Sequence, residues 1–368
     1  MMLKKKHINN TTNFANTLLQ WNNLDNTRQM PWKGEKDPYK VWLSEIILQQ
    51  TRVEQGLAYY NAFIKQFSNI NKLAAAPDEK VFKLWEGLGY YSRCRNLLAT
   101  ARFISKEKKG VFPNTYDDIV QLKGVGPYTA AAIASFVYNL PYAVVDGNVF
   151  RVLARVFGIN TAIDTTEGKK YFTRLANELL PKDNAGIYNQ AIMDFGAVVC
   201  KPAAPLCEIC PFNTTCIALK NKVVNQLPVK EKKLQQKKRW FYFLVMQHGN
   251  KTFIQQRTSK DIWNQLYQFP MIETSEATDT AVVLKEAEKL SWLTPGGYIS
   301  NKVSKVVKQQ LTHQQVHGSF IYVQFTQKPL KQTDWIAVTQ TQLQQYAFPK
   351  LIHLLWQQSL PNPSEGGA

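Results

Sequence analysis

The chain has 368 residues, which is long for one domain and comfortable for two, and 45% of them are hydrophobic, so a sizeable core can form. Lysine and arginine outnumber aspartate and glutamate by 45 to 27, a formal net charge of +18 that favours nucleic acid or an anionic membrane surface as partner. No run of eighteen apolar residues could span a bilayer and Met1–Asn10 lacks the apolar core of a secretion signal, so we expect a protein of the reducing cytoplasm.

The first two hundred residues have the apolar spacing that is typical of helices. In the first of them, Phe14, Leu18, Leu19 and Trp21 face inward. The predicted helices span residues 13–24, 39–51, 53–67, 71–76, 78–86, 93–106, 115–122, 127–136, 148–157, 165–180 and 188–199. This pattern predicts an all-α region.

Glu45 lies in the second of these helices among apolar residues. Val41, Trp42 and Leu48 share its face, so its carboxyl should be partly desolvated. Burial raises the pKa of a glutamate above its free value of about 4.3, and a carboxyl that is protonated near neutral pH can act as a general acid. The alternative is a glutamate that turns to solvent or pairs with an arginine.

Tyr90 and Tyr91 directly follow the glycines of Gly87–Gly89. Paired tyrosines at a helix junction are usually core residues, but one that stays exposed can stack on a base or wedge between bases. Ser92 is expected to cap the basic helix that follows. The basic residues of that helix are Arg93, Arg95, Arg102 and Lys106.

Gly124 and Gly126 bracket Val125 and predict a tight turn between two short helices, because such a turn usually needs positive φ or close backbone approach. Pro127 suits the first turn of the second helix. The N–H groups of the turn and the positive end of the helix form a site for an anion such as a phosphate. The alternative is an ordinary helix–turn–helix with a glycine cap.

Asp146 comes just before the predicted helix 148–157, where it can serve as the N-cap. A capping aspartate accepts hydrogen bonds from backbone N–H groups, which favours its ionised form. A carboxylate held there could also face a developing positive charge, and the two roles are compatible.

Four of the five cysteines have the spacing Cys-x6-Cys-x2-Cys-x5-Cys: Cys200, Cys207, Cys210 and Cys216. In a reducing setting this clustering indicates metal ligands rather than disulfides. Zinc sites normally use two separated pairs, so a compact single run favours an iron–sulfur cluster over zinc. Cys94 is left over and is expected to be a buried thiol.

Lys220–Arg239 is a basic stretch that predicts a linker, either a solvated tether or a segment in contact with phosphates. Beyond it the apolar pattern changes to period two. The predicted strands are 241–246, 252–256, 303–312 and 319–325, and the predicted helices are 278–293 and 348–356. We therefore expect an all-α region over 1–219, a linker over 220–239, an α+β domain over 240–358 and a tail over 359–368.

Several motifs together resemble one family, the helix-hairpin-helix DNA glycosylases with a [4Fe–4S] cluster, and among them the adenine DNA glycosylases, or MutY family. The matching segments are Trp42–Glu45, Leu48–Thr51, Gly87–Arg93, Gly124–Thr129, Val145–Arg151 and the four cysteines. The domain after the linker is similar to the Nudix-like recognition domain of that family. The resemblance implies one [4Fe–4S] cluster in the loop 200–216, double-stranded DNA with an adenine:8-oxoguanine mispair as partner, and a monomer in the cytoplasm, associated with the nucleoid if bacterial.

The resemblance implies that Glu45 protonates adenine at N7 and that ionised Asp146 stabilises the oxocarbenium-like sugar, which water then attacks. Tyr128 and Asn148 would lie around the sugar and Asp146. The adenine has to leave the base stack to reach this site. The residues expected to contact DNA or bases are Arg28, Trp32, Leu48, Gln50, Thr51, Tyr90, Lys123, Gly124, Val125, Gly126, Gln190, Thr312 and His313.

Tyr128 distinguishes this chain from endonuclease III-type enzymes, which carry a lysine at that position and use its amine for a Schiff base and strand cleavage. A phenol cannot form a Schiff base, so the resemblance implies a monofunctional glycosylase. Lys123 is close by in the sequence but lies on the hairpin side, which makes it a poor substitute.

The sequence departs from the family pattern at three places. Leu311-Thr312-His313 stands where the family has Phe-Ser-His, so a hydroxyl donor is kept and an aromatic ring is lost. Lys33 replaces the arginine that is common after Pro-Trp and removes a bidentate donor. The acidic signature of catalytic Nudix hydrolases is absent between residues 278 and 300, so the second domain should recognise rather than hydrolyse.

Two other functions stay open at this point. A bifunctional endonuclease III-like glycosylase and lyase would act on oxidised pyrimidines, and Tyr128 argues against it. A non-catalytic DNA-binding iron–sulfur protein that senses redox state would not need Glu45 or Asp146 for its function.

Overall fold

The computed structural model describes residues 2–231, 236–330 and 332–359, with side chains from residue 13 onward except at 301 and 359. They form two compact units, one made of residues 2–75 and 96–231 and the other of residues 76–95, 236–330 and 332–359. Residues 76–95, which were predicted to belong to the helical region, contain the helix Asp78–Trp85 and the start of the helix at Tyr91, but they group with the second unit.

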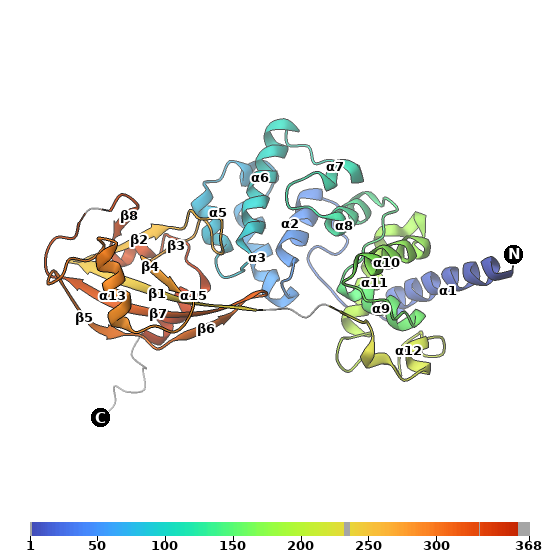
Figure 1. Ribbon diagram of the computed structural model, residues 1–368. Helices are drawn as coiled ribbons and strands as arrows, with labels where there is room; N and C mark the ends of the chain where they lie inside the picture. The colour runs from blue at the N-terminus through green and yellow to red at the C-terminus, as the bar shows by residue number, and fades with distance from the viewer. Residues whose placement is uncertain (1, 232–235, 331, 360–368) are drawn as a thin grey trace, which may run out of the picture. The chain divides into compact units, whose positions relative to one another are not determined.

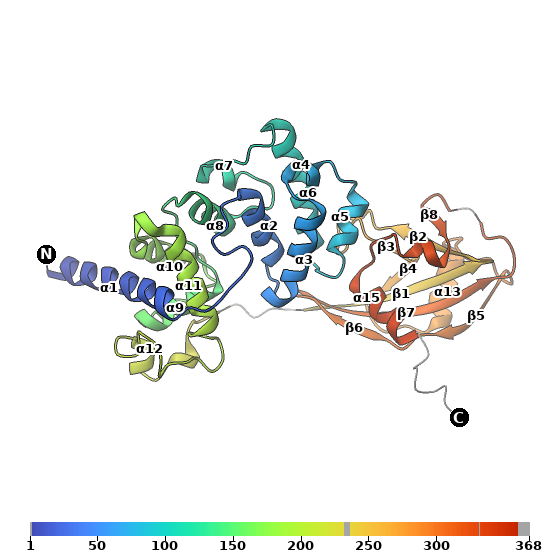
Figure 2. The same ribbon diagram turned by 180° about the vertical axis from the view of Figure 1, so that it is seen from behind.

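The first unit is all-helical (Figures 1 and 2). Its helices are α1 (Met2–Leu24), α2 (Pro38–Leu48), α3 (Val53–Gln66), α4 (Ile70–Ala74), most of α6 (Tyr91–Glu107), α7 (Tyr116–Val120), α8 (Pro127–Tyr138), α9 (Gly147–Phe157), α10 (Thr166–Leu179), α11 (Ala185–Val198) and α12 (Ile217–Lys220), with 3₁₀ turns at Lys182–Asn184 and Val224–Gln226. Helix α11 packs against α1, α8 and α9, so it lies at the centre of this unit.

The inward face of α1 is confirmed, because Phe14, Leu18 and Trp21 are buried in the core with α9, α10 and α11. The Phe14 ring stacks on Phe212 with centroids 4.8 Å apart, and the Trp21 ring meets Phe195 edge-on at 5.0 Å. Aromatic pairs of this geometry add to the stability gained from burial alone.

Several predicted helix boundaries in this part of the chain were wrong, among them the start of α1, which is Met2 rather than residue 13, and two boundaries close to candidate site residues. Helix α2 ends at Leu48 rather than Thr51, since the Thr51 N–H bonds back to the Leu48 carbonyl in a turn and Gln50 takes a left-handed backbone with φ of 55°. Helix α6 begins at Tyr91, so Ser92 lies inside its first turn and does not cap it.

The second unit is an eight-stranded mixed sheet with helices. Its elements are α5 (Asp78–Trp85), β1 (Lys237–His248), β2 (Lys251–Gln256), β3 (Tyr267–Gln268), β4 (Met271–Thr274), α13 (Thr280–Lys289), β5 (Tyr298–Val303), β6 (Val307–Gln310), β7 (Gln314–Phe325), β8 (Trp335–Val338), α14 (Gln340–Leu343) and α15 (Lys350–Ser359). Strands β1 and β7 are parallel at its centre, from Lys237 opposite Gln314 to Gln247 opposite Gln324, and the other pairings are antiparallel.

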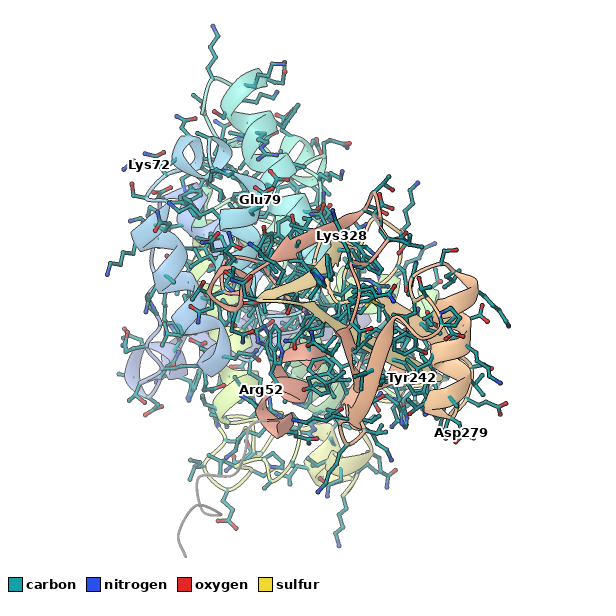
Figure 3. The ribbon with its side chains drawn as sticks, turned by 90° about the vertical axis from the view of Figure 1, so that its left-hand side faces the viewer. Arg52, Lys72, Glu79, Tyr242, Asp279 and Lys328 are labelled. Carbon is teal, nitrogen blue, oxygen red and sulfur yellow. The ribbon has the colours of Figure 1, made fainter. Side chains whose placement is uncertain are left out.

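Helices α13 and α15 cover opposite faces of this sheet, since α13 lies in front of it in Figure 1 and α15 in Figure 2. The α13 face is packed with aliphatic residues and with aromatic rings such as Tyr242 and Phe325, and the N-terminal end of α13 is anchored by a 2.7 Å hydrogen bond from the Thr278 N–H to the Tyr242 hydroxyl. Figure 3 shows Tyr242 and Asp279, the residue before α13. The α15 face is aromatic and includes Phe269, Phe348 and Trp356.

The predicted strand 303–312 was wrong, because it is divided between β5 and β6. Both pair with β7, and between them Ser304 bonds to Phe320 through its backbone N–H and through its hydroxyl, which accepts from the Phe320 N–H. The linker assignment was also wrong at its end. Arg239 is a buried residue of β1 with ion pairs of 2.6 Å to Asp261 and to Glu273, so it is not a surface cation available to phosphates.

The expected class is confirmed: an all-helical region with a hairpin between α7 and α8, followed by a domain with a mixed sheet. Among the described residues, no helix is both long and apolar enough to cross a membrane.

Candidate active site

Glu45 is buried within α2, with only 6% of its surface exposed, because the residues from Val41 to Ile47 are buried on every side of this helix. Burial raises the pKa of Glu45 to about 7, and the nearby charge of Asp146 adds to the rise while a hydrogen bond with Tyr128 opposes it. The predicted desolvation of this carboxyl is therefore confirmed, and the proposed alternatives of solvent exposure and arginine pairing do not hold.

Asp146 caps α9, as predicted. Its Oδ1 accepts from the Val149 N–H at 2.8 Å and its Oδ2 accepts from the Asn148 Nδ2 at 2.7 Å. Burial nevertheless raises the pKa of Asp146 above its usual value, and these hydrogen bonds hold the rise in check. The cap predicted the hydrogen bonds that favour the ionised form of Asp146, but local sequence gave no sign of the burial that opposes it.

Tyr128, in the first turn of α8, completes this group. It hydrogen-bonds Glu45, and burial together with the charges of Glu45 and Asp146 raises its pKa well above 10. Its hydroxyl also lies 3.9 Å from the sulfur of Met193 on α11. The structure thus brings Glu45, Tyr128, Asp146 and Asn148 together from α2, α8 and α9, and we call this set the carboxyl site.

Asn148 is held by Arg151, a buried arginine of α9 that was not predicted as a site residue. The Nη2 of Arg151 donates to the Asn148 Oδ1 at 2.8 Å and to the Gly196 carbonyl at 2.6 Å, and its Nε donates to the Cys200 carbonyl at 2.7 Å. Arg151 is 8% exposed. It links the backbone next to Asp146 with α11 and with the start of the cysteine loop.

The hairpin has the geometry that its glycines predict. Gly124 has a φ of 81°, and a Cβ at this position would lie 2.7 Å from the Cβ of Asn96, so only glycine fits. The N–H of Val125 donates to the Leu122 carbonyl, and Lys123 is exposed. Gly126 caps α8, whose first-turn N–H groups have no partner inside the helix.

Gln49 contributes to this hairpin although the sequence analysis did not select it. Its Nε2 donates to the Thr129 hydroxyl at 3.2 Å and so ties the end of α2 to α8. The neighbouring residues expected to contact DNA lie in the same turn, where Leu48 and Thr51 are half-buried and Gln50 is exposed.

Two of the residues expected to contact DNA or bases, Arg28 and Gln190, meet at one carboxylate, and a third, Trp32, packs against another ring. Arg28 makes an ion pair of 2.9 Å with Asp194, and the Gln190 Nε2 donates to the same carboxylate at 3.1 Å. Trp32 is buried edge-on against Tyr60, with ring centroids 5.2 Å apart. Asp194 was missed by the sequence analysis, and the only signal for it was its position four residues after Gln190 on one helix face.

In the second unit, Tyr90 and Tyr91 differ in burial. Tyr91 is 5% exposed and belongs to the core, whereas Tyr90 is 43% exposed with a φ of 47°. The hydroxyls of Tyr90 and Thr312 hydrogen-bond each other, and Arg93 lies over the Tyr90 ring at 5.4 Å. His313 is exposed next to Thr312.

The four cysteines line one cavity with apolar residues of α9 and α11, among them Val156 and Phe195. Arg155 is fully buried beside them, with its Nη1 3.5 Å from the Cys200 sulfur and its carbonyl 3.3 Å from the Cys216 sulfur. Within the described residues, no three His, Cys, Asp or Glu side chains are grouped closely enough to hold a metal ion. Four cysteine thiols that line one cavity fit the ligand set of an iron–sulfur cluster, which is held by cysteine thiolates. Cys94 is buried as expected, and burial raises the pKa of its thiol.

Comparison with known proteins shows similarity over nearly the whole chain. The family model for the HhH-GPD superfamily base excision DNA repair protein matches residues 43–182, and that for the NUDIX domain matches residues 241–358. The adenine DNA glycosylase of Buchnera aphidicola subsp. Baizongia pistaciae is 35% identical over 313 residues, which cover 84% of this chain and 86% of that protein. The human adenine DNA glycosylase is 40% identical over 216 residues, 56% of this chain and 39% of that protein.

Solved structures agree with the fold of the first unit. A thermostable thymine-DNA glycosylase is 29% identical with a TM-score of 0.54, covering 58% of this chain and 98% of that one. Endonuclease III in a non-covalent DNA complex, at 19% identity and a TM-score of 0.50, covers 58% of this chain and 97% of that one and shares the fold. The chain therefore belongs to the adenine DNA glycosylase family of base excision repair, enzymes that hydrolyse the N-glycosidic bond of adenine in DNA.

Proposed function

We propose that this enzyme removes adenine paired with 8-oxoguanine, and with guanine, by hydrolysis without strand cleavage. The observation that carries the proposal is the carboxyl site, in which Glu45 is buried with a pKa of about 7 beside Tyr128 and Asp146. Two neighbouring carboxyls with different environments can divide the roles of acid and anion, as in glycoside hydrolysis generally.

Glu45 would donate its proton to N7 of the extruded adenine, so that the base leaves as a neutral molecule when the bond from C1′ to N9 breaks. The electrons of that bond go to the base, and the sugar becomes an oxocarbenium ion. The Asp146 carboxylate, held by Val149 and Asn148, would stabilise this positive charge. Water then adds at C1′ and loses a proton, which leaves an abasic site.

Tyr128 supports the absence of a lyase step. The group at this position is a phenol whose pKa is raised well above 10, so it stays protonated and offers no amine to C1′. Its hydrogen bond to Glu45 would instead help to orient the acid. The sequence alternative of a bifunctional enzyme requires a lysine here, and none of the residues that meet at the carboxyl site is one.

We further propose that the four cysteines hold one [4Fe–4S] cluster with a structural role. The cluster would cross-link the loop 200–216 through four iron–sulfur bonds. Arg155 donates to the carbonyls of Lys201 and Pro202 at 2.8 and 3.2 Å, which fixes the loop around Cys200. The thiols are partly buried in an apolar cavity, and cluster assembly would have to release their protons.

Recognition of the opposite base would belong to the second unit. Tyr90 is exposed in a left-handed backbone conformation, and its hydroxyl and that of Thr312 already meet. An exposed ring can stack on a base or enter the stack, and a neighbouring hydroxyl can hydrogen-bond 8-oxoguanine. Thr312 can therefore serve in place of the serine that is usual in the family.

The deciding experiment is a single-turnover assay on duplexes with adenine opposite 8-oxoguanine, guanine or thymine, using enzyme that carries its cluster. We expect free adenine from the first two duplexes and strand breaks only after alkali. A covalent adduct trapped by borohydride would favour the bifunctional enzyme. DNA binding without adenine release would favour the redox sensor, and in either case the proposal fails. Size-exclusion chromatography should show a monomer.

A further inference from the structure

Asp194 on α11 is a buried carboxylate that the proposed reaction does not use. Its side chain is 0% exposed. Its Oδ1 accepts from the Arg28 Nη1 at 2.9 Å and from the Gln190 Nε2 at 3.1 Å, and its Oδ2 accepts from the Lys33 Nζ at 2.9 Å and from the Asn26 Nδ2 at 3.0 Å. Two carboxylate oxygens offer about four acceptor sites, so Asp194 is fully engaged.

Asp194 organises the segment between α1 and α2. Asn26 also accepts from the Arg28 N–H at 3.1 Å, and Lys33 also donates to the Arg28 carbonyl at 2.9 Å. This segment has turns but no regular helix or strand, so its shape depends on such side-chain bonds. A buried charge needs partners of opposite charge, and here Arg28 and Lys33 supply them from this segment.

Asp194 also fixes the orientation of the Gln190 amide. A carboxylate only accepts hydrogen bonds, so the nitrogen of the amide must face Asp194 and the oxygen must face away from it. None of the described residues donates a hydrogen bond to that oxygen. Gln190, Met193 and Asp194 share one face of α11, and Met193 touches the Tyr128 hydroxyl of the carboxyl site at 3.9 Å. The amide oxygen is thus presented as an acceptor next to that site.

We propose that Asp194 is a positioning residue for adenine recognition, which holds Gln190 with its oxygen toward the exocyclic amino group of the extruded base and holds Arg28 beside it. The inference rests on the proposed function. A base with an oxygen in place of the amino group, such as hypoxanthine, would put two acceptors against each other. Asp194 thereby makes the site selective for an amino purine.

The test compares single-turnover release of adenine and of hypoxanthine, each placed opposite 8-oxoguanine, by the wild-type enzyme and by Asp194→Asn. The side-chain amide introduced by this substitution can both donate and accept a hydrogen bond. It therefore no longer forces the nitrogen of the Gln190 amide, rather than its oxygen, to face position 194. We expect the adenine rate to fall about tenfold to a hundredfold and the ratio of the two rates to fall at least about tenfold, because a flipped amide can donate to hypoxanthine. A purely structural loss would lower both rates equally.

Glu35→Gln is the matched control. Glu35 accepts from Lys40 at 3.0 Å and from the N–H groups of Lys36 and Asp37 in the same segment, but it does not contact Gln190. Its ratio of rates should stay within about twofold of wild type.

A double-mutant cycle with Gln190→Ala shows whether Asp194 acts through the amide. If it does, Gln190→Ala alone lowers the ratio of the adenine rate to the hypoxanthine rate. Adding Asp194→Asn to Gln190→Ala then changes this ratio by less than about twofold. If Asp194→Asn does not fold, Asp194→Glu keeps the charge but displaces the oxygens, and the same fall in the ratio is expected. An unchanged ratio in a folded variant, or additive effects in the cycle, would overturn the inference. Failure of the wild type to release adenine would instead overturn the proposed function.

Discussion

The carboxyl site in the first unit and the Tyr90–Thr312 pair in the second are built in opposite ways. Glu45 and Asp146 are held inside a helical core, where burial moves their pKa values away from those in water. Tyr90 and Thr312 reach outward from a helix junction and from a turn between strands. Proton transfer near neutral pH requires a desolvated acid, whereas contact with a base in DNA requires an accessible ring. The two proposed roles therefore require opposite degrees of burial from the fold.

The contacts that hold the carboxyl site and the Tyr90–Thr312 pair in place differ as well. The carboxyl site is fixed by short hydrogen bonds within the helical core, such as those that Arg151 makes to Asn148 and to Gly196. The segment 76–95 that carries Tyr90 is joined to the sheet domain through Glu86, which accepts from the Phe348 N–H at 2.7 Å and from the His353 Nε2 at 2.9 Å. We expect substitutions in the first group to abolish the chemistry and those in the second to change selectivity.

The largest effect is expected for Asp146→Asn. It removes the charge that would stabilise the oxocarbenium ion, so single-turnover adenine release should fall by about a thousandfold or more. Asparagine is also a good N-cap, so the free energy of unfolding should change by less than about 1 kcal/mol. Adenine release and chemical denaturation measure the two quantities on the same preparation. If the fall in the rate were accompanied by a large fall in the free energy of unfolding, Asp146 would act only as a helix cap.

The second prediction concerns the iron–sulfur loop of the first unit. Cys207→Ser removes one ligand of the proposed cluster, so the loop 200–216 should lose its order and become sensitive to protease. We expect DNA affinity to fall at least about tenfold, while the rate of adenine release from the bound complex changes less. The visible absorbance of the cluster, a binding titration and a single-turnover rate at saturating enzyme give the three readings. If the single-turnover rate of adenine release fell while DNA affinity stayed unchanged, the cluster would contribute to the chemical step rather than to DNA binding.

The third prediction separates the function of Glu45 from its effect on stability. Its pKa rises from 4.5 in the unfolded chain to about 7 in the folded protein, so the folded state binds the extra proton between these values and its stability falls as pH rises through them. Glu45→Gln removes this penalty and should stabilise the protein by up to about 3 kcal/mol above pH 7, with no gain below pH 4.5. Adenine release should still fall at least about a hundredfold. Urea denaturation at pH 5 and pH 8 gives the comparison.

The same titration predicts the pH profile of the wild-type enzyme. If the protonated form of Glu45 is the acid, the single-turnover rate should be constant well below pH 7 and fall about tenfold per unit above it. Rates measured from pH 6 to pH 9 at saturating enzyme test this directly. A rate that rises through pH 7 would show that Glu45 acts as a base.

The sequence allowed these residues to be predicted unequally, for physical reasons. Helical spacing was enough to predict that Glu45 is buried, and the position of Asp146 before a helix was enough to predict the cap. Asp194 and Arg151 could not be found in this way, because their partners come from segments far apart in the chain. A local pattern describes one face of one helix, and it cannot say which distant side chain will meet that face.

The same limit applies to the second unit. Strands β3, β4 and β8 have two to four residues each, too short for an alternating pattern to be recognised. Arg239 was assigned to the linker because it ends a run of basic residues. In the fold it is buried and forms ion pairs with Asp261 and Glu273, which lie far along the chain. The grouping of residues 76–95 with the sheet domain had no signal in composition, since it depends on single contacts such as those of Glu86.

The smallest effect is expected for Glu86→Gln, which tests whether the joint between α5 and α15 supports recognition of the opposite base. Burial raises the pKa of Glu86, but the bonds from His353 and Lys83 outweigh it, so the net shift is downward and the carboxylate is the favoured form. The glutamine keeps one acceptor and places an NH₂ group against the remaining donors, which should loosen Tyr90 relative to Thr312. We expect the preference for adenine opposite 8-oxoguanine over guanine to fall about threefold to tenfold, with little change in the rate opposite guanine. Thr312→Ala should lower the same preference, and combining it with Glu86→Gln should add little. Equal losses on both mispairs would show that Glu86 supports the fold and not the recognition of the lesion.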